Sequence, residues 1–351
     1  MNRSTMPARL ITVIIAVIIT PLAAGLIATG GNAWIFTVFR YASSSVDFGE
    51  LAVPILIQLA GILLLLLVVL TGIWSSAGLI AVGVLALVPL LVALFPALMM
   101  HVYHLTAGLV PREWIDGLAY GLPMMLFPVL GTMGIVLALV RRRPAPGGTG
   151  LAIIGVIAAP VLLLSGALLL NWGLGSGYIA ALQQNRLEFL PLPAAAVLIG
   201  GLLVIAGIFV TRWSAFALLL PAIALLATSA FALAPGAMFR LLSALPIELN
   251  RTLSTLLVIG GGTAAALVYI TFTVVLLRVR KNAAGSAPDA VTNMPPAAYA
   301  APYPPAAPSP GAAPHPAPYP PAAAPPAPYP PTAAPPAAPP AAPPYPPAPG
   351  S

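Results

Sequence analysis

The chain has 351 residues, of which 60% are hydrophobic and only 6% are charged, and its mean hydropathy is +1.02. Soluble domains keep about a quarter of their residues charged, so this composition excludes an ordinary soluble protein and indicates a lipid bilayer. The net charge of +7 does not indicate nucleic-acid binding, because the basic residues are scattered or flank apolar runs and form no stripe. The absence of cysteine excludes disulfides, thiolate catalysis and cysteine-ligated metals. All cations except Lys281 are arginines, which with the abundant Ala, Gly and Pro is typical of a GC-rich bacterial genome.

Eight apolar stretches are long enough to cross a hydrocarbon core about 30 Å thick as helices. They lie at 10–29, 51–71, 77–100, 119–140, 151–172, 194–210, 214–235 and 252–277. Each must be helical, because backbone groups left unpaired in lipid are very costly. The sequence therefore predicts an all-α integral membrane protein with eight transmembrane helices.

The basic residues that flank these stretches predict the orientation of the chain. With the N-terminus in the cytoplasm, nine of them lie at the inner ends and five at the outer ends, which satisfies the positive-inside rule. We therefore expect a multi-pass plasma-membrane protein with both termini in the cytoplasm. The first span is expected to stay in the protein and not to act as a cleaved signal peptide, because its apolar run is long.

The first span contains a sequence segment that recurs later in the chain. The segment IIAVIITP at 14–21 is followed by the similar segment IIGVIAAP at 153–160. The separation in sequence between them, from residue 14 to residue 153, is called the repeat offset. At the same offset Pro54 meets Pro193, and Trp74 meets Trp213. These matches predict two tandem four-helix repeats, and an even number of spans in each gives both copies the same orientation. The expected domains are 1–143, a Pro/Gly connector at 144–148, and 149–281.

Two residue pairs are repeated in and just after the first span of each copy. Pro21 and Pro160 lie inside these spans, where proline removes a backbone hydrogen bond and bends a helix. Such kinks either open a central cavity or are tolerated in packing. Asn32 and Asn171 follow these prolines, and each either binds a ligand or caps a helix end.

One polar cluster follows the third span. His101 and His104 are three residues apart, and Glu113 and Asp116 follow them. Two imidazoles and two carboxylates suit zinc or an acid–base pair. The positions in the second copy are not histidines, so the alternative is that these histidines simply face water and lipid headgroups.

The span cores contain no Asp, Glu, Lys, Arg or His, and Gln58 is their main amide. Proton pumps and ion-coupled carriers usually need ionisable groups at depth. The sequence therefore favours an apolar or amphipathic ligand, including lipid, over an ion. Glycine clusters at 117–121, 131–134 and 260–263 predict a tight helix contact, which would be either the seam between the copies or a homo-oligomer face.

From residue 282 the composition changes to Pro, Ala and Tyr, with the motif PYPP repeated. Residues 282–351 are predicted to be a disordered cytoplasmic tail in extended, left-handed polyproline conformations. Tyr303, Tyr319, Tyr329 and Tyr345 are its expected contacts with cytoplasmic proteins that have aromatic grooves.

Three functions follow from these features. The first is a non-enzymatic membrane protein whose tail recruits or clusters partners. The second is a carrier or channel for an apolar or amphipathic, lipid-like molecule at the seam between the copies. The third, an outward-facing metal enzyme, needs the two histidines and two carboxylates to converge. Neither of the first two requires a cofactor.

Overall fold

The computed structural model describes residues 6–40, 48–106, 108–119, 121–142, 149–179, 188–230, 234, 236–237, 240, 243–246, 250 and 259–284. The chain divides into two units, Met1–Val291 and Thr292–Ser351. The predicted tail beyond Ala284 and its four tyrosines lie outside the described residues. All regular elements within them are helices.

Seven stretches of the described chain are long and apolar enough to cross a membrane, so the expected multi-pass membrane protein is confirmed. Six of them contain one long helix each: α1 (Met6–Arg40), α2 (Phe48–Thr71), α7 (Leu122–Arg142), α8 (Thr149–Gly173), α10 (Pro191–Phe209) and α14 (Gly261–Ala284). The seventh contains α3 (Ala77–Leu85) and α4 (Leu87–Leu94). Within the predicted span 214–235 lies α11 (Leu219–Ser229), which is apolar but has only 11 residues. The count of eight spans is therefore not confirmed.

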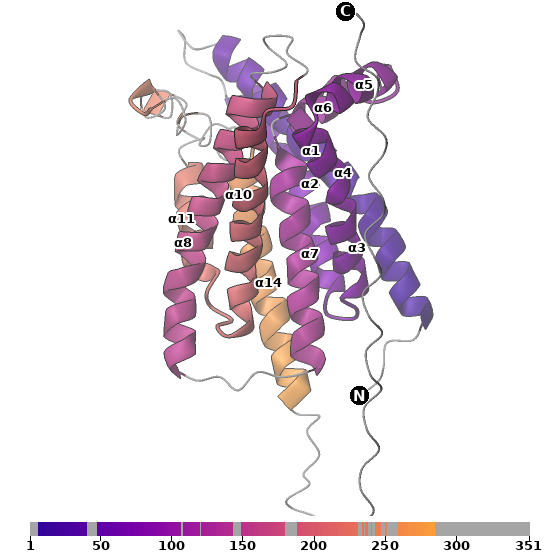
Figure 1. Ribbon diagram of the computed structural model, residues 1–351, viewed down its shortest axis with the longest axis vertical. Coiled ribbons are helices and arrows are strands. Elements are labelled where there is room, and N and C mark those ends of the chain that lie inside the picture. Colours follow the sequence, from indigo (N-terminus) through magenta and orange to yellow (C-terminus); the bar gives the residue numbers. More distant parts are fainter. Residues whose placement is uncertain are drawn as a thin grey trace, which may run out of the picture. The chain divides into compact units, whose positions relative to one another are not determined.

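The third span ends earlier than the sequence predicts. The backbone of Phe95 is extended, with φ −121° and ψ 95°, and Pro96 starts α5 (Pro96–Thr106). Proline disfavours a helical conformation in the residue before it, which explains the break. α5 and α6 (Arg112–Ala119) lie across one end of the bundle (Figure 1). The short helices η1 (Leu174–Ile179) and η2 (Val210–Arg212) extend α8 and α10.

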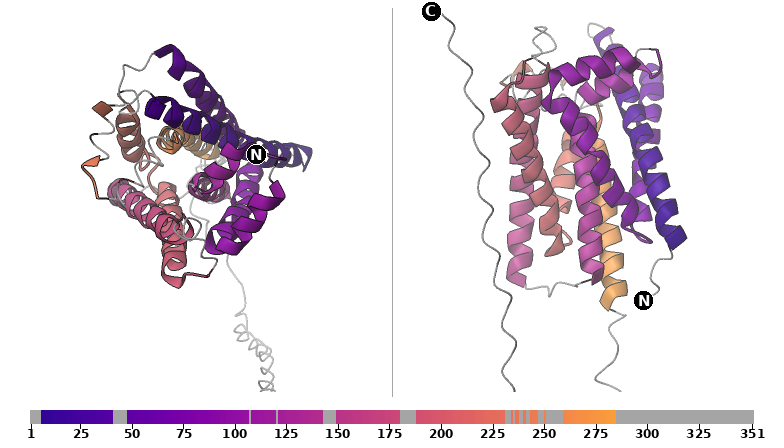
Figure 2. Two further views of the ribbon diagram at one scale, coloured as in Figure 1. Left: turned by 90° about the horizontal axis from the view of Figure 1, so that it is seen from above. Right: turned by 45° about the vertical axis from the view of Figure 1, so that its right-hand side comes forward.

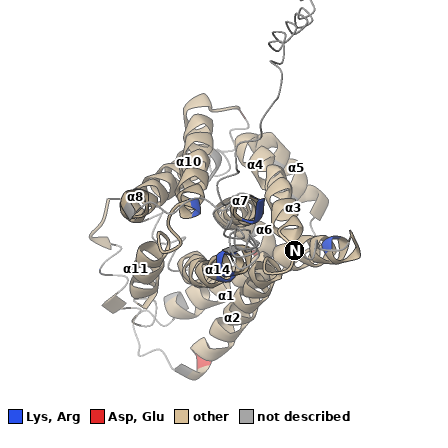
Figure 3. Ribbon diagram, turned by 90° about the horizontal axis from the view of Figure 1, so that it is seen from below, with Lys and Arg blue, Asp and Glu red and all other residues tan. Residues whose placement is uncertain are grey.

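The start of α1 and the end of α14 lie at the same end of the bundle, opposite to α5 and α6 (Figures 1 and 2). Viewed from that end, the helix termini carry Lys and Arg (Figure 3). Arg141 and Arg142 end α7, and Lys281 lies in the last turn of α14. The opposite end carries Glu113 in the first turn of α6.

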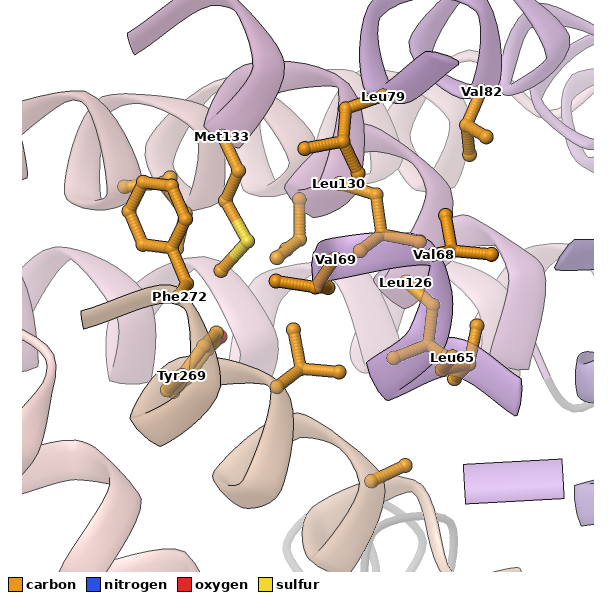
Figure 4. Packing of buried hydrophobic residues seen from close by; sticks show 14 of the residues in the cluster. Leu65, Val68, Val69, Leu79, Val82, Leu126, Leu130, Met133, Tyr269 and Phe272 are labelled. Atoms are coloured by element: carbon orange, nitrogen blue, oxygen red, sulfur yellow. The ribbon is translucent and has the colours of Figure 1, made fainter. Parts of the chain in front are cut away.

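The centre of the bundle is formed by α7 and α14. In the most apolar window of each, 72% and 56% of the residues are buried, against 28–39% for the other spans. Their side chains interlock with those of α2 and α3 in one core that includes Leu65, Val69, Leu130, Met133 and Phe272 (Figure 4). The other helices therefore surround this central pair, and their exposed apolar faces suit contact with lipid.

The glycines of α7 allow the backbone of α3 to pack closely against α7. A Cβ on Gly131 would lie 2.3 Å from the Cα of Gly83, and a Cβ on Gly134 would meet the backbone of Ile80 at 2.8 Å. This face of α7 is thus used inside the chain, against α3, as small residues allow in membranes. The expected homo-oligomer face remains a prediction.

Several contacts of the first half recur in the second half at the repeat offset. Arg141, at the end of α7, donates hydrogen bonds from Nη2 to the carbonyl oxygens of Gly72 and Ile73, the latter over 3.0 Å. Arg280 donates in the same way to Thr211 and Arg212, over 2.9 Å each. Each arginine therefore pairs with the carbonyls that follow the second long helix of its own half.

The glycines that precede α7 and α14 also correspond. Gly121 and Gly260 both have φ +79°, a left-handed conformation that glycine adopts without strain. Each introduces a long central helix.

The first helix of each half differs in its register. Gly30 lies against Pro54, with a Cβ placed 2.7 Å from its carbonyl oxygen, and Gly173 lies in the same way against Pro193. Pro54 and Pro193 are separated by the repeat offset, but Gly30 corresponds at that offset to Leu169, one helical turn before Gly173. α8 is therefore displaced along α10 by one helical turn, compared with α1 along α2. A displacement of one turn keeps the same face of the helix toward its neighbours.

Candidate functional site

The predicted metal or acid–base cluster is spread over two helices. His101 and His104 lie exposed on α5, and Glu113 is half-buried on α6. The side chain of Asp116 is outside the described part. Among the side chains that are described, no group of three or more His, Asp or Glu could hold a metal ion. The four-residue site thus remains a prediction.

The two predicted asparagines are both buried within helices. Asn171 donates from Nδ2 to the carbonyl oxygen of Ala167 over 2.9 Å, a bond within its own helix. Asn32 is 6% exposed, and its Nδ2 has no hydrogen-bond partner among the described groups. The two residues therefore do not make equivalent contacts.

The prolines lie inside α1 and α8, as expected, and each lines a cavity. The expectation was one cavity at the seam with Pro21 and Pro160 on its two sides. The described part of the chain instead has a separate cavity at each proline. α7, the most buried span, contributes to the walls of both cavities, Leu126 to one and Phe127 to the other.

The first cavity, named here the α8–α11 cavity, has a volume of about 290 Å³. Its walls come from α7, α8, α10, α11 and α14, so it lies where the two halves of the chain meet. Among its lining residues only Thr228 and Tyr269 have polar side chains. The hydroxyl of Thr228 donates to the carbonyl oxygens of Ala224 and Leu225 in its own helix, over 2.9 and 3.0 Å. An apolar cavity of about 150 Å³ already holds a benzene ring, so this one holds a larger apolar group.

The α8–α11 cavity opens toward the side of the bundle. α8 packs mainly on α10, and α11 packs mainly on α14, so the contact between α8 and α11 is sparse. Two lining residues at this boundary are exposed, Leu164 (64%) on α8 and Ala224 on α11. Both lie on apolar helices of the bundle, where the surroundings are lipid. The mouth of the cavity therefore lies on an exposed, apolar side of the bundle.

A second cavity of about 250 Å³, the α1–α4 cavity, lies in the first half. It is lined by residues of α1, α3, α4, α6 and α7, among them Pro21, Leu85, Pro89 and Phe127. Val88 of α4 lines it and is 58% exposed, so this cavity also reaches the lipid-facing surface.

Trp114 of α6 forms part of the wall of the α1–α4 cavity. Its indole lies against Gly25 of α1, so closely that a Cβ on Gly25 would come within 2.3 Å of the ring. Next to it, a Cβ on Gly117 would lie 2.4 Å from the Cβ of Ala28. Only glycine at residue 25 leaves room for the indole. α6 is thereby fixed on α1.

Neither family models, curated proteins nor solved structures gave a match to this chain.

The sequence alone does not single out the residues that shape the cavities. Trp114 lies between Glu113 and Asp116, and the strong amphipathic pattern of 112–119 indicates that its apolar face packs on the bundle. Leu164, Ala224 and Tyr269 carry no comparable signal, because one apolar residue in a membrane helix resembles the next.

Proposed function

We propose that this multi-pass membrane protein is non-enzymatic and binds an apolar or amphipathic molecule of the lipid class in the α8–α11 cavity. The single observation that supports this proposal best is the cavity itself. Its walls are apolar, and its mouth lies between two helices that expose apolar side chains. Such a cavity favours the apolar part of a ligand and gives no compensation for a desolvated ion.

The bilayer provides the route into the cavity. A molecule already dissolved in lipid reaches Leu164 and Ala224 by lateral diffusion and does not need a water-filled pore. Because Thr228 has already used its hydroxyl within α11, Tyr269 is the lining side chain whose hydroxyl can orient an amphipathic ligand.

Two further features of the proposal concern the whole membrane domain. We infer that residues 1–143 and 149–281 are tandem copies, which the matched arginine contacts and the matched glycines before α7 and α14 support. We also infer that the end where α1 begins and α14 ends is cytoplasmic, because Lys and Arg gather there.

A photoreactive ligand tests the binding proposal. The full chain in nanodiscs is irradiated with diazirine-bearing stearic acid, and the labelled peptides are mapped by mass spectrometry. We expect saturable labelling of α8 and α11, which excess unlabelled stearic acid removes.

Two variants of α11 give a matched pair for this experiment. Ala224→Phe fills the mouth of the cavity, whereas Ala227→Phe adds the same ring at an exposed position that does not line it. We expect the first variant to lose the labelling and the second to keep it. Labelling that cannot be competed, or that is equal in both variants, would contradict the proposal.

A second candidate function rests on the tail sequence, where the PYPP motif occurs four times. We propose that these motifs, with Tyr303, Tyr319, Tyr329 and Tyr345, bind cytoplasmic proteins several at a time. Changing all four tyrosines to Ala should remove proteins that co-purify with the full chain, while Trp172→Ala in the membrane domain should not. Identical co-purified proteins with and without the tyrosines would reject this function.

A further inference from the structure

Arg212 occupies a position that holds an isoleucine in the first half of the chain. At the repeat offset Arg280 corresponds to Arg141, and each donates to two successive backbone carbonyls of its own half. The second of these carbonyls belongs to Arg212 in one half and to Ile73 in the other. The two halves therefore share the same backbone contact, and the second half adds a guanidinium next to it.

The positive charge of Arg212 is poorly compensated. The residue is half-buried, and its Nε–H is buried without a hydrogen-bond partner among the described groups. Arg280, which touches the backbone of Arg212, uses one nitrogen, Nη2, for both of its carbonyl bonds. A buried donor without an acceptor is costly, and like charges on touching residues disfavour each other. An anion in contact with both guanidinium groups would compensate them.

The described carboxylates do not supply this anion. η2, which carries Arg212, follows α10 at the end of the bundle where α1 begins and α14 ends. Lys and Arg gather at this end (Figure 3). The acidic residues of the described ranges lie at the opposite end, and they are Glu50, Glu113, Asp116 and Glu188. Within the described part of the chain, the guanidinium groups therefore face an end of the bundle that carries no negative charge.

The surroundings of Arg212 suit a lipid headgroup. The next residue, Trp213, is 38% exposed, and exposed tryptophan beside a span is typical of the membrane–water interface. Further along the chain, Phe216, Leu220 and Ile223 are 53–61% exposed. A charged group at the level of the headgroups is thus followed by apolar side chains that can contact acyl chains.

We propose that Arg212 and Arg280 bind the phosphate group of an anionic phospholipid. The planar guanidinium offers paired N–H donors that match phosphate, and basic groups between membrane helices are typical sites for anionic headgroups. Neither arginine lines the α8–α11 cavity, so this site does not rest on the function proposed for that cavity.

Native mass spectrometry of the full chain in detergent, titrated with dioleoylphosphatidylglycerol, tests the proposal. We expect one lipid to bind each chain before any other, and Arg212→Ile to weaken this binding about tenfold. The variant should keep the backbone contact of Arg280, because Ile73 accepts the same contact in the first half. Arg142→Gln is the matched control, because it removes an exposed charge from the end of α7 and should leave the binding unchanged.

A gain of binding gives a second test that does not depend on how well Arg212→Ile folds. Ile73→Arg places a guanidinium next to the Arg141 contact, and we expect this variant to retain a second lipid. Inorganic phosphate and dioleoylphosphatidylcholine separate the possible sources of the phosphate group.

Three results would overturn the proposal. The first is equal affinity of the unchanged chain and Arg212→Ile for dioleoylphosphatidylglycerol. The second is equally tight binding of dioleoylphosphatidylcholine, which carries no net charge. The third is displacement of the lipid by excess inorganic phosphate, which would assign the site to a free anion.

Discussion

Arg141 and Arg280 lie near the ends of the two central helices and bind carbonyl groups just after α2 and α10. A helix leaves its last carbonyls without partners, and a guanidinium satisfies two of them at once. Arg141→Gln should lower the free energy of unfolding by about 1.5–3 kcal/mol, the usual contribution of hydrogen bonds to charged groups. Thermal unfolding in detergent measures the change. Arg142→Gln, at the exposed neighbouring residue, should leave it almost unchanged.

Gln58 makes a hydrogen bond between α2 and the residues just before α14. Its Nε2 donates to the carbonyl oxygen of Ile259 over 3.0 Å, next to Gly260. Gln58→Leu should destabilise the protein by about 0.5–1.5 kcal/mol, as for other hydrogen bonds between membrane helices. Ser165→Ala is the comparison, because that hydroxyl bonds only within its own helix. Equal melting temperatures for both variants would show that the Gln58 bond contributes nothing.

At the scale of elements, the crossing of α3 and α7 depends on the close approach of two glycines, Gly83 and Gly131. Gly131→Ala places a methyl group against the backbone of Gly83, which a flexible side chain cannot relieve. The expected loss is about 1–3 kcal/mol, the usual cost of overpacking. Gly201→Ala on α10 meets no atom within 4 Å and should be neutral or stabilise by up to about 1 kcal/mol, because alanine favours helix. Denaturant unfolding checks this prediction, because the free energy of unfolding should fall in the first variant and stay equal or rise in the second.

The long helices could be predicted from sequence, but their breaks and crossings could not. Length and hydropathy place six long helices well, because lipid leaves a helix as the sole solution for an apolar run. They miss the end of the third span at Phe95, where Pro96 gave the signal, and the break at Gly260, whose φ of +79° interrupts the expected span 252–277 just before α14. They also cannot show that Gly131 packs on α3, because glycine spacing does not identify its partner.

For the whole molecule, the absence of cysteine permits labelling at single introduced thiols without background. Met6→Cys and Gly150→Cys lie at the end where α1 and α8 begin, and Leu109→Cys and Glu188→Cys lie at the other. In intact cells an impermeant maleimide should label the last two and spare the first two. Opening the cells should make all four reactive. Labelling of Met6→Cys in intact cells would contradict the inferred orientation.

The shapes of the cavities arise at this scale, which is why the sequence predicted one cavity at the seam and not two separate ones. A repeated proline in the first span indicated a kink, but the recess beside it depends on how closely α11 approaches α8 and on where α6 places Trp114. Both depend on residues distant in sequence. The polar residues that drew attention, His101 and His104, lie on an exposed helix away from either recess.

The arginine contacts also bear on how the protein is made. Each arginine bonds to carbonyls only 68 and 69 residues earlier, within its own half of the chain. The first half can therefore begin to close once α7 has left the ribosome, while most of the second half is still to be made. A released chain of residues 1–143 should then already resist protease in part.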